Sequence, residues 1–119
     1  MPFDPERYAA GLRKANEKER QEIAERAELA RREAGEVAHL IGERDANVER
    51  VYLFGSLLEE APRNPNFDID LALEGGDVYR AMETAEEASF SVDLVTLRRL
   101  PEHVRSRILE RGKILYERN

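Results

Sequence analysis

Residues 68–73 read DIDLAL, in which two aspartates alternate with apolar side chains. Successive side chains of a β-strand leave opposite faces of the sheet. The apolar residues of this stretch would therefore line a core, while Asp68 and Asp70 would share the opposite face. The pattern predicts a strand over residues 67–73 that brings two carboxylates onto one surface.

A third aspartate recurs in phase in SVDL, residues 91–94. If the apolar residues of this stretch also face the core, Asp93 joins Asp68 and Asp70 on one face of the sheet. Like charges about 4 Å apart repel by about 4 kcal/mol per pair at an effective dielectric constant near 20. A hard cation with oxygen ligands, Mg²⁺ or Mn²⁺, would offset this repulsion, and the chain has no cysteine. The alternative is that Asp68 caps the strand and Asp70 faces solvent.

Upstream of these aspartates lies the stretch FGS, residues 54–56, which follows an alternating segment and is separated from Asp68 by eleven residues. A glycine after a strand lets the backbone approach a ligand closely. Exposed N–H groups and a hydroxyl in such a turn suit phosphate oxygens. Alone, Gly55-Ser56 is an ordinary strand-ending turn, and its position before the aspartates makes it a candidate phosphate site.

Hydrophobic periodicity and the helix-breaking residues predict the remaining elements. The expected elements are a helix over 5–45, unbroken or broken near Gly11 or Gly35, strands at 48–54, 67–73, 90–96 and 113–117, a short helix at 57–61, and helices at 78–88 and 101–111. This order predicts an α/β (α+β) fold in which a small mixed sheet of three to four strands is flanked by helices. Residues 1–46 would form an N-terminal helical extension, and residues 47–119 the domain that carries the aspartates.

Small and apolar residues recur along the N-terminal helix at alternating steps of four and three, namely at Ile23, Ala27, Ala30, Ala34, Val37 and Ile41. This spacing is that of a coiled-coil seam. A long helix seldom persists unpacked. We therefore expect the seam to meet another surface, either the chain's own domain or another chain, and we favour a second copy of the chain or a partner protein.

The composition narrows the functional classes. The chain has 119 residues, enough for one domain, and its 19 Lys and Arg against 25 Asp and Glu give a net charge of −6. An acidic chain is a poor candidate for bulk binding of nucleic acid. Because the chain has no cysteine, disulfide scaffolds and thiolate zinc sites are excluded. No signal peptide or membrane span is expected, which favours a cytoplasmic protein. Arg105 and Arg107 are interpreted as a solvated helix face, with binding of phosphate or RNA as the alternative.

Taken together, FGS, DIDL and SVDL at this spacing resemble the minimal nucleotidyltransferases (MNT) of the DNA polymerase β superfamily, which are often paired with HEPN-domain toxins. The resemblance runs from about residue 48 to residue 117 and implies a polymerase-β-like nucleotidyltransferase fold. It implies that Gly55 and Ser56 bind the triphosphate of a nucleotide, and Arg63 is the nearest cation to that turn. It also implies that three carboxylates are catalytic metal ligands, those of Asp68, Asp70 and Asp93. Asp93 would in addition help to activate the attacking hydroxyl.

The chain departs from the family pattern directly after the turn, where Leu57-Leu58-Glu59-Glu60 replaces the basic residues that many members carry. The resemblance implies an Mg²⁺- or Mn²⁺-dependent enzyme that transfers AMP from ATP to a protein hydroxyl and acts as antitoxin to a HEPN-type toxin. The alternative is a binding module, catalytically weak or inactive, that neutralises its partner by contact. A nucleotidyltransferase acting on small molecules is a third interpretation, but such enzymes usually carry a further helical domain.

Overall fold

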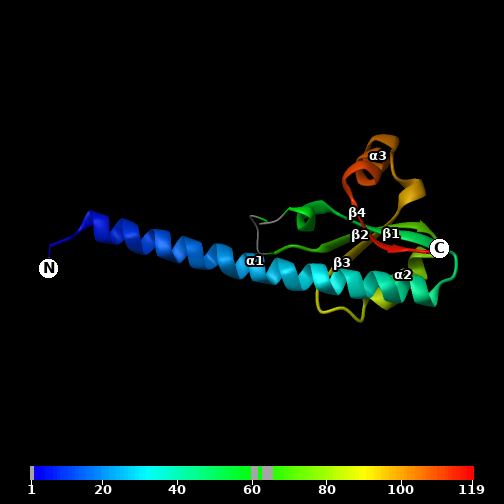
Figure 1. Cartoon of the computed structure of the whole chain (residues 1–119), viewed down its shortest axis with the longest axis horizontal. Coiled ribbons are helices and arrows are strands. Elements are labelled where there is room, and N and C mark those ends of the chain that lie inside the picture. The colour runs from blue at the N-terminus through cyan, green and yellow to red at the C-terminus, as the bar shows by residue number, and fades with distance from the viewer. Residues whose placement is uncertain (1, 60–61, 63–65) are drawn as a thin grey trace.

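The computed structural model describes residues 2–59, 62 and 66–119. The elements follow the predicted order and are α1 (Pro5–Arg44), β1 (Val48–Phe54), the 3-10 helix η1 (Gly55–Leu58), β2 (Ile69–Gly75), α2 (Val78–Ala85), β3 (Val92–Thr96), the 3-10 helix η2 (Leu97–Arg99), α3 (Glu102–Arg111) and β4 (Lys113–Glu117). One sheet stands between helices, with α1 and α2 on one face and α3 on the other (Figure 1). Within the described part, none of the helices combines the length and apolar character that a membrane span requires.

The sheet has the strand order β3-β2-β1-β4. Strand β1 pairs antiparallel with both β2 and β4, whereas β2 and β3 run parallel. Parallel neighbours need a crossover connection, and α2 lies within it. The mixed four-stranded sheet flanked by helices confirms the predicted fold class.

Each face of the sheet has its own apolar cluster. On one face, Ile69, Leu71 and Leu73 of β2 are buried against α1 and α2. On the other face, a smaller cluster joins Tyr52 of β1 to Ile108 of α3. The second cluster matters for function because it anchors α3 over the face that carries the aspartates.

The predicted boundaries are close to the observed ones, although α2 ends at Ala85 rather than at residue 88. Helix α1 is a single unbroken helix, because Gly11 and Gly35 take helical conformations inside it. Strands β2 and β3 each begin two residues later than predicted, at Ile69 and Val92. The short helix begins at the turn glycine itself, Gly55, rather than at residue 57.

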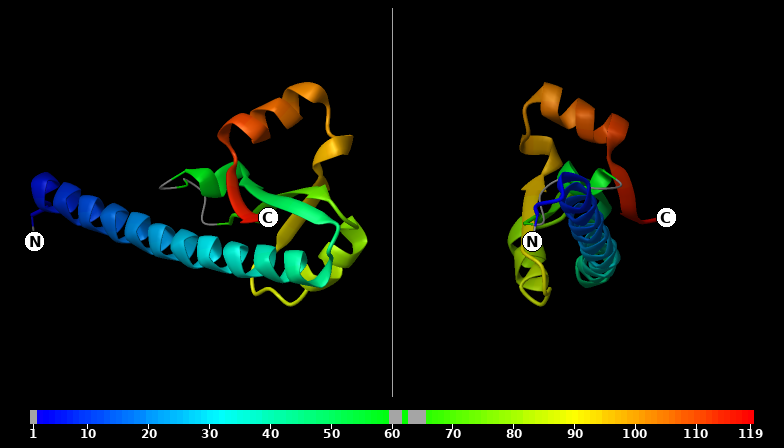
Figure 2. Two further views of the ribbon diagram at one scale, coloured as in Figure 1. Left: turned by 45° about the vertical axis from the view of Figure 1, so that its right-hand side comes forward. Right: turned by 90° about the vertical axis from the view of Figure 1, so that its left-hand side faces the viewer.

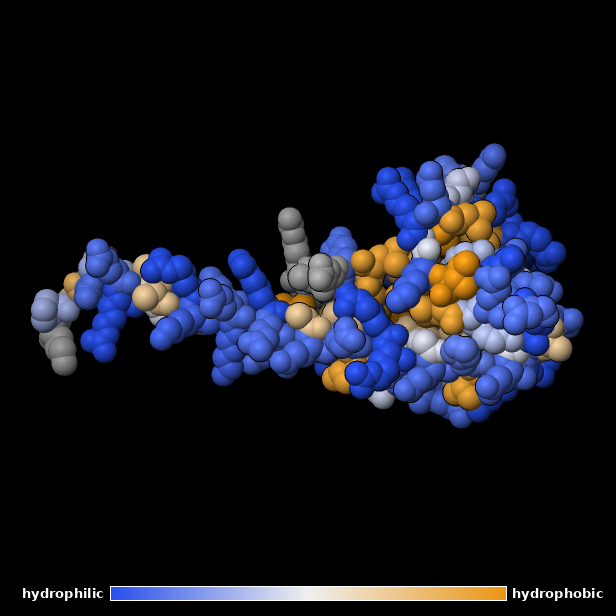
Figure 3. Space-filling model, in the orientation of Figure 1, coloured by the Kyte–Doolittle hydropathy of each residue, from blue (hydrophilic) through white to orange (hydrophobic). Residues whose placement is uncertain are grey.

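The seam of α1 packs within the chain. Its residues are buried against the sheet and α2, and they are Ile23, Ala27, Ala30, Ala34, Val37 and Ile41. The seam meets another surface as expected, but the prediction of a second copy or a partner on it is wrong. Steps of four and three place residues on one face of any helix, so a helix on a sheet shows the same spacing as a coiled coil. Before Ile23 the helix projects beyond the domain and is mostly hydrophilic (Figures 2 and 3).

One glycine of α1 is required for packing. A Cβ at Gly42 would collide with the ring of Tyr116, whereas a Cβ at Gly35 would meet no atom within 4 Å. We expect Gly42→Ala to lower the free energy of unfolding by about 1–2 kcal/mol through overpacking. The matched Gly35→Ala should raise it by about 0.5–1 kcal/mol, because alanine is the better helix former. Denaturant titrations followed by circular dichroism measure both, and equal stabilisation by both substitutions would contradict the observed packing.

Candidate active site

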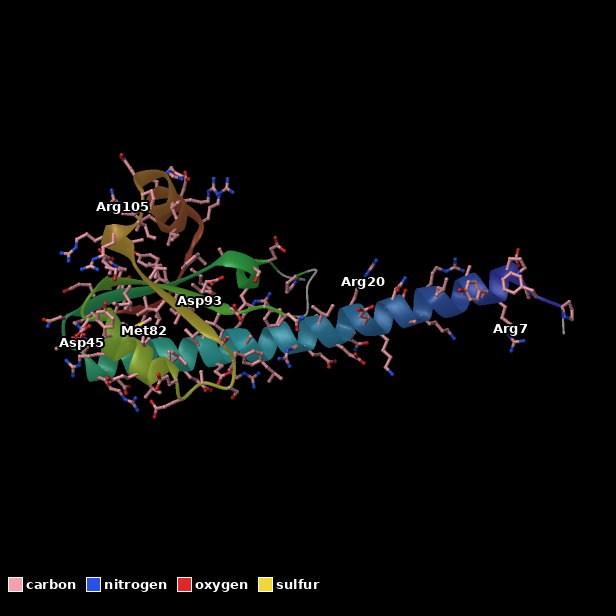
Figure 4. All side chains as sticks on the ribbon, turned by 180° about the vertical axis from the view of Figure 1, so that it is seen from behind. Arg7, Arg20, Asp45, Met82, Asp93 and Arg105 are labelled. Atoms are coloured by element: carbon pink, nitrogen blue, oxygen red, sulfur yellow. The ribbon has the colours of Figure 1, made fainter. Side chains whose placement is uncertain are left out.

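Asp70 occupies the centre of the candidate site. In the sheet it pairs with Phe54 of β1 on one side and with Asp93 of β3 on the other. Paired residues of neighbouring strands point to the same face, so the carboxylates of Asp70 and Asp93 leave the sheet together. The predicted phase of the two strands is therefore confirmed. Figure 4 shows Asp93 on β3, the strand at the edge of the sheet.

The central carboxylate, that of Asp70, is repelled by the negative charges of Asp68 and Asp93. The pKa of Asp70 is raised to about 6, mainly by burial and in addition by the negative charges of Asp93 and Asp68. Asp68 lies just before β2 and is exposed, as is Asp93, while Asp70 is partly buried. The site thus gathers negative charge around one partly desolvated carboxyl group.

Among the described residues, no lysine, arginine or histidine forms an ion pair with any of the three aspartates. Carboxylate oxygens with uncompensated negative charge are the donors that Mg²⁺ and Mn²⁺ prefer. The chemistry of this donor set therefore fits a divalent cation. Across the described part of the chain, however, no group of three or more His, Cys, Asp or Glu residues forms a ready-made metal site. The metal ligands Asp68, Asp70 and Asp93 accordingly stay a prediction.

The Gly-Ser turn lies directly against the central carboxylate. Gly55 has a φ of +80°, a conformation that disfavours any residue with a side chain. A Cβ on Gly55 would also collide with the carboxylate of Asp70. Glycine is thus needed here both for the turn and for the close approach. Ser56 follows it at the surface, exposed to solvent. The structure brings together the two motifs that the sequence separates.

A groove of about 620 Å³ begins at this turn and runs beneath α3. Its walls are the turn on one side and the inner face of α3 on the other, and its lining residues are Phe54, Gly55, Leu58, Glu59, Val104, Arg107, Ile108, Arg111 and Gly112. Arg63, predicted to bind phosphate, lies outside the described residues, as does Glu60. Among the described residues, the cations that line the groove are Arg107 and Arg111 of α3, while Arg31 of α1 donates hydrogen bonds to the carbonyl oxygens of Leu57 and Glu59 just after the turn.

Sequence reasoning treated Arg107 as a solvated residue by default and did not single out Arg111. The two are four residues apart in a helix, so they share one face, and this spacing is the signal that could have grouped them. The position of that face over the turn depends on how α3 packs on the sheet, which the local pattern does not show.

The chain belongs to a known family. The sequence profile described as polymerase beta, nucleotidyltransferase matches residues 37–119, from within α1 to the end of the chain. This chain is therefore a member of the polymerase β nucleotidyltransferase family, in agreement with the resemblance carried by its motifs. No protein with curated annotation matches the sequence.

Solved structures of the same fold include toxin–antitoxin complexes. The crystal structure of the MntA–HepT toxin–antitoxin is 22% identical, with a TM-score of 0.54 over 74% of this chain and 73% of that chain. A toxin–antitoxin structure with AMP-PNP is 24% identical, with a TM-score of 0.56 over 71% and 74%. A tri-AMPylated Shewanella oneidensis HEPN toxin in complex with MNT antitoxin gives 22% identity and a TM-score of 0.55 over 75% and 73%. At these identities the likeness shows the fold.

Proposed function

We propose that this protein is a divalent-metal-dependent nucleotidyltransferase that transfers AMP from ATP to a hydroxyl group of a partner protein. The observation that carries the proposal is the contact between the Gly55 turn and the carboxylate of Asp70, with Asp93 paired beside it. A turn that suits phosphates and a cluster of carboxylates that suits metal ions meet at one point of the sheet. Membership of the polymerase β nucleotidyltransferase family supports the same chemistry.

In the proposed reaction, the acceptor oxygen attacks the α-phosphorus of ATP and the bond from that phosphorus to the β-phosphate bridging oxygen breaks. Pyrophosphate leaves, and the hydroxyl proton passes to the carboxylate of Asp93, which is exposed on the edge strand and accessible to an incoming acceptor. Metal ions held by Asp68 and Asp70 would supply positive charge to the phosphates and lower the pKa of the acceptor hydroxyl. Gly55 and Ser56 hold the phosphate chain in line with the acceptor.

The acceptor is proposed to be a tyrosine of a HEPN-type toxin, which makes this protein an antitoxin. The site lies open on the sheet, and a docked protein would supply the wall that excludes water from the reacting atoms. Solved structures of this fold in complex with HEPN toxins support the choice of partner. The projecting part of α1 offers a further exposed surface for contact with the partner.

One observation favours a second candidate function, a binding module that neutralises its partner without catalysis. Glu59 lines the groove beside Gly55, where many family members carry a basic residue. A carboxylate at this position repels a triphosphate. If this repulsion prevents the triphosphate from binding, the protein would neutralise its partner by direct contact alone.

Intact-mass measurement distinguishes the two functions. The purified protein is incubated with the protein encoded beside it, Mg²⁺ and ATP. We expect the partner to gain the mass of one AMP per modified hydroxyl, and the gain to disappear with chelator or with Asp70→Asn. CTP, GTP and UTP in parallel reactions give the base preference. A stable complex with no mass gain from any nucleotide would overturn the enzymatic proposal and favour the binding module.

A further inference from the structure

The groove beneath α3 has the size and position of a ligand subsite. Its volume of about 620 Å³ falls within the range of about 300–1,000 Å³ typical of small-molecule sites. Gly55 contributes to it and also touches the carboxylate of Asp70. Gly55 therefore adjoins both the groove and the central carboxylate, so the groove lies next to the cluster of aspartates.

The charge of the groove suits an anion. Arg107 and Arg111 line it from the same face of α3, and the only acid in the described lining is Glu59. Neither guanidinium forms a hydrogen bond or an ion pair with any described residue. This is unlike Arg44 and Arg50, each of which pairs with a glutamate. Within the described part of the chain, both arginines therefore have unpaired donors at the wall of a groove, in a protein whose net charge is −6.

We propose that Arg107 and Arg111 bind the β- and γ-phosphates of the nucleotide in this groove. The inference rests on the proposed function and deepens it. Guanidinium groups bind phosphate oxygens in bidentate fashion, and they stay charged at any physiological pH. The two arginines supply from α3 the positive charge that the segment after Ser56 lacks. Glu59 lies in the same groove and opposes them.

Nucleotide binding to the whole chain, measured by calorimetry, tests this assignment without the partner protein. ATP and AMP are titrated in Mg²⁺ buffer into the wild type, Arg107→Ala, Arg111→Ala and the double variant. We expect each single substitution to weaken ATP binding about tenfold and the double substitution about a hundredfold. AMP binding should stay within about twofold of the wild type, because AMP lacks the phosphates in question.

Two further variants make the test specific. Arg105→Ala removes an arginine of the same helix that lines a different groove, beside Gly75 and Leu109, and should leave ATP binding unchanged. Glu59→Gln removes the opposing charge and should tighten ATP binding several-fold, a gain that a merely structural role of this groove does not predict. Thermal melting of every variant checks that the fold is intact.

The assignment is overturned if the double variant binds ATP as tightly as the wild type. It is also overturned if the substitutions weaken the binding of ATP and of AMP equally, which would place the nucleoside in the groove. A wild type that binds no ATP overturns it together with the proposed function. Failure of the two is otherwise distinguishable. ATP binding that depends on the arginines, without AMP transfer to the partner, supports the assignment and contradicts the enzymatic function. AMP transfer to the partner, combined with ATP binding that does not depend on the arginines, supports the enzymatic function and contradicts the assignment.

Discussion

Asp70→Asn is expected to reduce the rate of AMP transfer about a thousandfold or more while the protein stays folded. Asp70 stands between β1 and β3, touches the Gly55 turn and pairs with Asp93, so it contacts every part of the proposed site. Asparagine keeps the shape but removes the negative charge that would hold a metal ion against the phosphates. Several kcal/mol of transition-state stabilisation depend on such a ligand. Single-turnover assays with the partner protein measure the loss.

The same substitution should stabilise the protein in metal-free buffer. The folded-state pKa of Asp70, about 6, is raised above its ordinary value of 3.8, so ionisation of this carboxyl group above pH 6 costs stability. After allowance for solvent screening, this cost is about 1–2 kcal/mol. It declines as the pH falls from 6 and vanishes below 3.8, where Asp70 becomes protonated in both the folded and the unfolded state. Denaturation in chelator should show Asp70→Asn more stable than the wild type at pH 8 and equally stable near pH 3.5.

A surface carboxylate provides the matched control. Glu25 lies exposed on α1, away from the aspartates, and Glu25→Gln should change neither transfer nor its pH dependence. If Asp70→Asn proves as active as Glu25→Gln, Asp70 is not a catalytic residue. If it is less stable than the wild type at pH 8, the three carboxylates do not repel one another as described.

Gly55→Ala is expected to reduce transfer about a hundredfold or more. The new methyl group must hold a φ near +80° and would displace the carboxylate of Asp70 from its position against the turn. A displacement of about 1 Å at the reacting atoms is enough for a loss of this size. We expect both metal-dependent ATP binding and transfer to fall, as measured by calorimetry and intact mass.

Gly76→Ala separates this effect from general destabilisation. Gly76 has nearly the same φ, +81°, and a Cβ there would meet the side chain of Val48, far along the sheet from Asp70. Both alanine variants should therefore lose thermal stability. Only Gly55→Ala should lose activity per folded molecule, and equal losses of activity in the two would show that Gly55 has no special role at the site.

Local patterns were sufficient for the parts of the site that depend on strand faces. The alternation in residues 68–73 and 91–94 places Asp70 and Asp93 on the face opposite the larger apolar core, and the structure has them paired. The contact between Gly55 and Asp70 follows from the pairing of Phe54 with Asp70. Strand faces can be predicted because the two-residue period of a strand is independent of its partner.

Features that depend on distant packing could not be predicted in this way. The spacing of the α1 seam suits packing on a sheet, on a second helix or on another chain. The apolar face of the chain's own sheet, which the seam covers, decides which of these forms. Arg107 and Arg111 resemble ordinary surface arginines until α3 is placed over the Gly55 turn. Asp45 is a further example. It is buried at the end of α1 and accepts backbone hydrogen bonds from Asn47 and Asp77, a role that no local pattern indicates.

Crystals grown with Mn²⁺ and a non-hydrolysable ATP analogue test the central claim most directly, because the anomalous signal of manganese locates the metal without assumptions. We predict that the anomalous peak places manganese within bonding distance of the carboxylate oxygens of Asp68, Asp70 and Asp93. The phosphates of the analogue should lie against Gly55 and Ser56. Manganese bound elsewhere, or nucleotide density away from this face of the sheet, would contradict a metal-dependent nucleotidyltransferase site at the three aspartates.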